Sequence, residues 1–159
     1  MVLWVVWFMV LMSGSAALAF DVSPSFLGMY RKTIEIDAEI FDYSERYGID
    51  PRMARALILY ESGGNREWVS VSGVTGYFQL PSGLVRMLGD VNRVEAGIKY
   101  LAQLQQQFER EDYLLAAFKE GPDRIVGGAP LHFEIVQYVV GVGAYKVLLQ
   151  EHGAEVRRQ

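Results

Sequence analysis

Apolar residues recur at spacings of three and four along most of the chain, which is the pattern of helices that bury one face. The longest stripe runs from Val94 through Ile98 and Leu101 to Phe108, with polar side chains between these positions. It predicts an amphipathic helix of about four turns. No segment alternates apolar and polar residues over the length of an ordinary strand, although residues 69–75 could form a short irregular hairpin. The sequence therefore predicts an all-α fold of about six helices.

Cap and turn residues set the limits of the other expected helices. Asp50 suits the N-cap of one helix, and Gly63 suits its end. Residues 20–32 show no clear period, so we expect an extended lead-in there. The expected helices cover residues 33–47, 51–61, 112–119 and 130–151, with a short helix or turn within 76–88. We therefore expect one domain over residues 33–152, followed by a tail at 153–159.

The start of the chain has a different composition. Residues 1–12 are wholly apolar, and the small residues that follow end in Ala-Leu-Ala at 17–19. This pattern predicts a signal peptide at 1–19 and an exported protein, periplasmic or associated with the cell wall. The apolar run is shorter than the ~20 residues of a membrane span. No Lys or Arg precedes it, however, so an uncleaved membrane anchor remains the alternative.

Composition excludes several classes of function. All charged residues follow Ala19, and the formal net charge of −4, without a basic stripe, argues against a nucleic-acid partner. The chain has no cysteine, so packing alone must hold the exported domain together. His132 and His152 lack the spacing of metal ligands. We expect no metal or other cofactor, and a monomer.

The segment from Pro51 to Leu80 has the residues of a sugar-cleaving site. Glu61 ends an apolar helix and is followed directly by a Ser/Gly-rich stretch, so the helix carries one acid to a loop. Cleavage of a glycosidic bond needs a proton donor, and most glycosidases add a second carboxylate. Glu67 is the nearest alternative for that second group. Tyr77, Phe78 and Gln79 supply rings and an amide that suit a sugar cleft.

Four short motifs follow one another along residues 47–145 and resemble the soluble lytic transglycosylases, lysozyme-like enzymes that cleave the glycan of bacterial peptidoglycan. The motifs are Glu61-Ser62-Gly63-Gly64-Asn65 with Ser70, Gly73 and Gly76-x-x-Gln79-Leu80, then Gly97-x-x-Tyr100-Leu101, then Ala116-Ala117-Phe118-Lys119-Glu120-Gly121-Pro122, and finally Phe133-Glu134 with Tyr138-Val139. The resemblance implies a helical fold like that of goose-type lysozyme. It also implies that Glu61 acts as the sole acid and base, splitting the MurNAc–GlcNAc β-1,4 bond without water to leave a 1,6-anhydroMurNAc end.

The same resemblance implies a set of substrate-binding residues. Gln79 is expected to bond the sugar amide, and Ser70 to orient Glu61. Glu134 and Tyr138, one helical turn apart, are expected to approach the cleft. The full expected set is Ser70, Tyr77, Phe78, Gln79, Phe118, Glu134 and Tyr138. Peptidoglycan strands would be the partner, and enzymes of this kind often serve a secretion, conjugation or flagellar apparatus.

The chain also departs from the pattern of that family. Phe118, Lys119 and Glu120 replace the family's Tyr-Asn-Ala, and Arg93 stands where an asparagine is common. A cation at Lys119, if it lay close to Glu61, would favour the ionised carboxylate and weaken it as an acid. Two alternatives therefore stay open. One is a peptidoglycan-binding or scaffold module with impaired catalysis, and the other is a hydrolytic muramidase.

Overall fold

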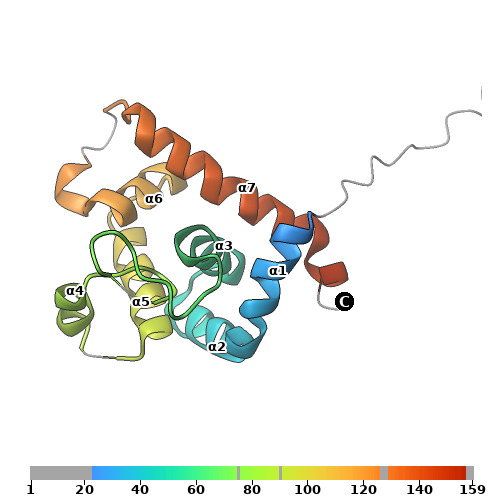
Figure 1. Ribbon diagram of the computed structural model, residues 1–159. Coiled ribbons are helices and arrows are strands. Elements are labelled where there is room, and N and C mark those ends of the chain that lie inside the picture. Colours follow the sequence, from blue (N-terminus) through green and yellow to red (C-terminus); the bar gives the residue numbers. More distant parts are fainter. Residues whose placement is uncertain (1–22, 75, 90, 126–128, 157–159) are drawn as a thin grey trace, which may run out of the picture.

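The computed structural model describes residues 23–74, 76–89, 91–125 and 129–156. The predicted signal peptide at 1–19 lies outside these residues. All the regular elements of the described chain are helices, which confirms the predicted all-α class (Figure 1). They are α1 (Pro24–Lys32), η1 (Ile34–Ile36), α2 (Asp37–Tyr47), α3 (Pro51–Ser62), α4 (Ser82–Met87), α5 (Arg93–Gln105), α6 (Glu111–Glu120), η2 (Pro122–Arg124) and α7 (Phe133–Val156). Among them, none is long and apolar enough to cross a membrane.

Helix α3 forms the centre of the domain. It packs against α2 on one side and against the long helix α7 on another. Helix α5 packs against both α2 and α6 (Figure 1). Every residue from Met53 to Leu59 is buried, because this helix is apolar on nearly all of its faces. Asp50 caps its start by accepting a hydrogen bond from the Arg52 N–H (2.9 Å), as the sequence predicted. The helix therefore carries Glu61 from the core to the surface.

The first helix, α1, replaces the extended segment that the sequence predicted for residues 20–32. The Ser23 hydroxyl accepts from the Phe26 N–H (3.2 Å), and Pro24 occupies the first helical turn. Phe26 and Tyr30, four residues apart, are both buried, and the Phe26 ring stacks on Tyr145 of α7 at 5.9 Å. Two buried aromatic residues are too few to show a helical period in the sequence. The packing of Phe26 on Tyr145 therefore decides that this segment is a helix.

Other limits also shift. The predicted helix at 33–47 is divided, because η1 gives way to α2 at Asp37. Helix α7 begins three residues later than predicted and runs through Gly153 into the expected tail. The possible hairpin at 69–75 is a tight turn in which the Ser70 N–H donates to the Val74 carbonyl (2.9 Å).

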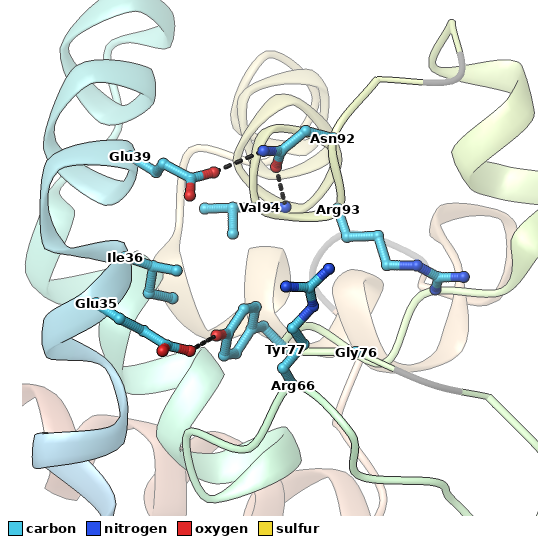
Figure 2. A pocket seen from close by; sticks show the side chains of 9 residues that line it. All are labelled: Glu35, Ile36, Glu39, Arg66, Gly76, Tyr77, Asn92, Arg93 and Val94. Atoms are coloured by element: carbon cyan, nitrogen blue, oxygen red, sulfur yellow. Dashed lines mark hydrogen bonds between the residues drawn. The ribbon is translucent and has the colours of Figure 1, made fainter.

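Asn92 caps α5 by accepting from the N–H groups of Val94 (2.7 Å) and Glu95 (3.2 Å) (Figure 2).

A buried arginine in the N-terminal half of α3 binds this helix to the segments around α1 and α2. Arg55 is only 4% exposed, donates to the Thr33 hydroxyl (2.6 Å) and forms an ion pair with Asp37. Its guanidinium also lies over the Tyr30 ring, 4.8 Å from the centroid. Because a buried charge is tolerated when it is paired and hydrogen-bonded, these contacts fix α3 against α1 and α2.

Two glycines of α7 give a matched test of packing behind the site. A β-carbon at Gly141 would lie 2.3 Å from the Tyr60 ring, whereas one at Gly143 would meet nothing within 4 Å. We expect Gly141→Ala to lower the free energy of unfolding by about 1–3 kcal/mol through overpacking. Gly143→Ala should raise it by ~0.5–1 kcal/mol, since alanine favours the helix. Urea unfolding of both variants checks this, and equal effects would contradict the close approach of the two helices.

Candidate active site

Glu61 lies in the last turn of α3. The Ser62 hydroxyl donates back to the Ile58 carbonyl (2.9 Å), and Gly63 ends the helix with a left-handed φ of 59°. The Glu61 side chain is 8% exposed, which distinguishes it from an ordinary acid at a helix end. A nearly buried carboxyl group at the end of the central helix is a candidate general acid.

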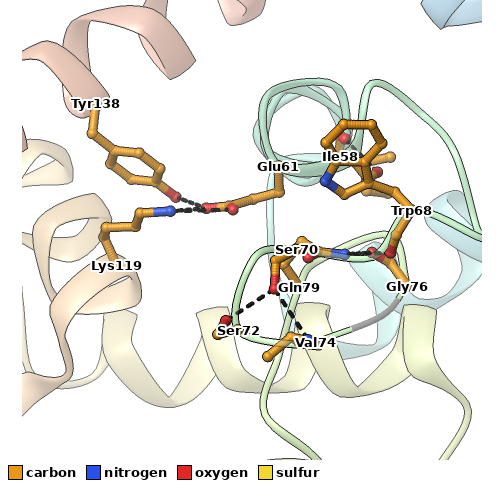
Figure 3. A network of polar contacts seen from close by, with 11 residues as sticks. Ile58, Glu61, Trp68, Ser70, Ser72, Val74, Gly76, Gln79, Lys119 and Tyr138 are labelled. Atoms are coloured by element: carbon orange, nitrogen blue, oxygen red, sulfur yellow. Dashed lines mark hydrogen bonds and ion pairs between the residues drawn. The ribbon is translucent and has the colours of Figure 1, made fainter.

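Tyr138 of α7 holds this carboxylate. Its hydroxyl donates a hydrogen bond of 2.7 Å to Glu61 Oε1 (Figure 3). Burial, together with the negative charge of Glu61, raises the pKa of Tyr138 well above its ordinary value, so the phenol keeps its proton and stays a donor. The Tyr60 ring packs edge-on against Tyr138 at 5.1 Å and fixes the position of the phenol. The structure therefore brings Tyr138 to the acid, as the sequence predicted.

Lys119 of α6 completes the contacts around the acid. Its Nζ lies 3.3 Å from each oxygen of Glu61 and 4.9 Å from the centroid of the Tyr138 ring (Figure 3). The Lys119 side chain is 44% exposed, so water and salt screen the ion pair in part. The departure at position 119 thus places a cation directly against the acid, which is the condition that the sequence analysis named, and the weakening of the acid stays a prediction.

The loop after α3 uses its polar groups to hold its own shape. The Ser70 hydroxyl is bonded to Ser72 Oγ (2.9 Å) and accepts from the Val74 N–H (3.0 Å) (Figure 3). Gln79, with a φ of 51°, donates from Nε2 to the carbonyls of Trp68 (3.1 Å) and Gly76 (2.6 Å). The prediction that Ser70 orients Glu61 is therefore not supported, because the turn itself engages this hydroxyl. A bond from Gln79 to a sugar stays a prediction, with its nitrogen already committed to backbone.

The aromatic residues of the predicted set lie in the core. Phe78 and Phe118 are both buried, with ring centroids 6.3 Å apart, and Tyr77 is buried with its hydroxyl donating to Glu35 (2.7 Å). Phe78 also lies against Gly97, where a β-carbon would be 2.1 Å from its ring. Phe78 and Phe118 support the loop from behind, where they pack against Gly97 and Tyr100 of α5. Contact of Tyr77, Phe78 and Phe118 with substrate stays a prediction.

Glu134 does not join the site. Its side chain is 80% exposed and pairs with His132 (3.0 Å), although Tyr138 lies only one turn further along α7. In contrast, sequence reasoning missed Trp68, which is 51% exposed on the loop after α3 and whose carbonyl accepts from Gln79 (Figure 3). A large aromatic residue inside a Ser/Gly-rich surface segment was the signal that could have identified it.

Helix α1 covers the turn that follows the acid. A β-carbon at Gly64, where φ is 72°, would lie 2.6 Å from the Met29 carbonyl oxygen and 3.0 Å from a methyl carbon of Thr33. Only glycine combines this backbone angle with so close an approach. The loop after Glu61 is therefore packed against the backbone of α1.

Comparisons with known proteins agree with this architecture. The chain is similar in structure to lytic transglycosylase Slt from Pseudomonas aeruginosa, solved as an inactive mutant in which one glutamate is replaced by glutamine. The TM-score is 0.61 at 22% identity, over 74% of this chain and 24% of that one, so this chain spans about a quarter of the length of that protein. The family described as "Transglycosylase SLT domain" matches residues 39–126, more than half of the chain. The chain belongs to the transglycosylase SLT domain family.

Proposed function

We propose that this protein is a peptidoglycan lytic transglycosylase in which Glu61 is the acid and base. One observation carries the proposal. A nearly buried glutamate stands at the end of the central helix, held by the Tyr138 hydroxyl at 2.7 Å, in a chain of the SLT family. In the similar Slt protein, the inactive mutant has one glutamate replaced by glutamine, which is consistent with a reaction that needs a carboxyl proton.

The proposed reaction needs one carboxyl group. Protonated Glu61 gives its proton to the oxygen between MurNAc and GlcNAc, and the bond from that oxygen to MurNAc C1 breaks. The resulting carboxylate then takes the proton of the MurNAc C6 hydroxyl, whose oxygen bonds to C1. Throughout, the Tyr138 hydroxyl stabilises the charge on Glu61 by donating to Oε1.

The second carboxylate that hydrolysis commonly uses is not supplied by Glu67. Its side chain is 87% exposed and points toward Arg66, at 3.9 Å. A glycosidase needs its base or nucleophile facing the acid across the sugar. This position favours the reaction with one carboxylate over the muramidase alternative.

Digestion of purified peptidoglycan tests the proposal. The products are treated with borohydride and weighed by mass spectrometry, because a reducing sugar end gains hydrogen and a 1,6-anhydro end does not. We expect anhydro ends that resist reduction. Reducible ends would instead identify a muramidase and overturn the lytic reaction.

A second candidate rests on Lys119. A cation 3.3 Å from both oxygens of Glu61 holds the carboxyl group in an ion pair, which competes with the glycosidic oxygen for it. The protein would then be a peptidoglycan-binding module with impaired catalysis. Retention of the protein on sedimented peptidoglycan, with no product released, would favour this candidate.

A further inference from the structure

A pocket of about 480 Å³ lies beside the start of α5 and is not lined by Glu61, Lys119 or Tyr138. Its walls come from η1 and α2, from the loop that follows α3, and from the N-terminal end of α5 (Figure 2). Charged residues line it together with the apolar side chains Ile36 and Val94. The lining residues are Glu35, Ile36, Glu39, Arg66, Gly76, Tyr77, Asn92, Arg93 and Val94.

One wall carries two carboxylates held by hydrogen bonds. Glu35 accepts from the Tyr77 hydroxyl (2.7 Å), and Glu39 accepts from the Asn92 side-chain amide (2.6 Å) (Figure 2). Each carboxylate can still accept further bonds, because one such bond leaves most of its lone pairs free. This wall suits an ammonium group.

The positively charged side chains of the pocket, Arg66 and Arg93, lie on the side opposite the two carboxylates (Figure 2). Arg66 extends from the loop over Tyr77 (Figure 2), and among the described residues its ion pair is with Glu67, at 3.9 Å, not with Glu35 or Glu39. In the described part of the chain, Arg66 is therefore not neutralised by Glu35 or Glu39. A guanidinium in this position can bind a carboxylate through two parallel hydrogen bonds.

Arg93 adds a second built feature. The stem of its side chain lies across Gly76, where a β-carbon would be 3.2 Å from Arg93 Cδ and where φ is 105°. Glycine at 76 thus makes room for an arginine at the edge of the pocket. Arg93 is also a position at which the sequence departs from the family's common asparagine, so this charge belongs to this chain rather than to the shared pattern.

We propose that this pocket binds a short peptide that carries both a free carboxylate and a free ammonium group. The carboxylate pairs with Arg66, the ammonium with Glu35 and Glu39, and the apolar part lies against Ile36 and Val94. The assignment of its source rests on the proposed function, since peptidoglycan strands carry such peptides on their sugars. Binding here would make the enzyme prefer strands that carry peptides over bare glycan.

Titration of the intact protein with the tripeptide alanyl-γ-glutamyl-lysine, followed by NMR, tests the pocket directly. We expect Arg66→Ala to weaken binding about tenfold, as for the loss of a hydrogen-bonded charge. Arg52→Ala is the matched control, because Arg52 is also a surface arginine beside a carboxylate, Asp50 at 3.1 Å, but lies at the far end of α3. The same tripeptide with its amines acetylated and its carboxylates amidated should not bind.

A second experiment separates the two possible sources, free peptide and glycan-linked peptide. With peptide-bearing strands as substrate, Arg66→Ala should raise KM and leave kcat unchanged, and with peptide-free strands it should change neither. Binding of the free tripeptide alone, without this effect on strands, would overturn the glycan-linked source. Tripeptide binding that depends on Arg66 in a protein that cleaves no glycan would support the pocket while the proposed function fails. Absence of binding, or equal binding by Arg66→Ala, would overturn the pocket whatever the activity.

Discussion

Replacing Glu61 with glutamine is expected to remove the release of anhydro products. Glutamine keeps an oxygen that can accept from the Tyr138 hydroxyl, so the fold and the binding of glycan should persist, but it has no proton to give. Loss of a general acid and base lowers rates by ~10²- to 10⁴-fold. The measurement is the initial rate of anhydro-muropeptide release from peptidoglycan, with sedimentation of the variant on the same material as the measure of binding.

Glu67→Gln is the matched control for this variant. It removes a carboxylate six residues further along the chain, on the loop that follows α3, from a side chain that is 87% exposed. Its rate should equal that of the parent. If Glu61→Gln kept the parent's rate, or if Glu67→Gln lost it, the assignment of the acid to Glu61 would be wrong.

Replacing Lys119 with asparagine should increase activity. The ammonium group lies 3.3 Å from both oxygens of Glu61, and this ion pair must be broken before the carboxyl group can engage the glycosidic oxygen. Because Lys119 is 44% exposed, the pair is worth about 1 kcal/mol, which corresponds to about a fivefold gain in rate. The measurement is the initial rate of anhydro-muropeptide release from peptidoglycan.

Lys119→Arg separates charge from shape in this test. It keeps the cation and should not show the gain in rate, while Lys119→Met should behave like Lys119→Asn. Activity that appears only in the uncharged variants would establish the parent as the impaired binding module. A loss of activity in Lys119→Asn, with unchanged unfolding, would mean that the cation assists the reaction, contrary to this account.

The helices could be predicted where periodicity and caps act locally. Asp50 and Gly63 mark the ends of α3 in the sequence and in the structure, because the cap and the left-handed turn are properties of a few adjacent residues. Helix α1 could not be predicted in this way. Its stability comes from Phe26 and Tyr30 packing on distant elements, and single-segment patterns do not record such contacts.

The residues of the candidate site show the same contrast between local sequence and long-range packing. The position of Glu61 at the end of an apolar helix predicted an acid carried to a loop, and the family motifs added Tyr138. The direction in which a side chain points could not be predicted in this way. Phe118 and Glu134 lie in matched motifs, yet one is in the core and the other in solvent, because packing between helices decides which face of each helix is covered.

The charged pocket was beyond sequence reasoning for a simpler reason. Its three walls are formed by segments around Glu35, Arg66 and Asn92, which are far apart along the chain. No local motif contains a pocket of this kind, and each of its charged residues alone resembles an ordinary surface side chain.

The packing of Gly64 against α1 has an evolutionary consequence. A side chain at position 64 would have to displace the main chain of α1 at Met29, and not merely another side chain. A relative that keeps this first helix must therefore keep glycine at the corresponding position. A relative that has lost the helix escapes this clash and meets only the strain of the left-handed backbone, which asparagine tolerates, so the two features should be inherited together.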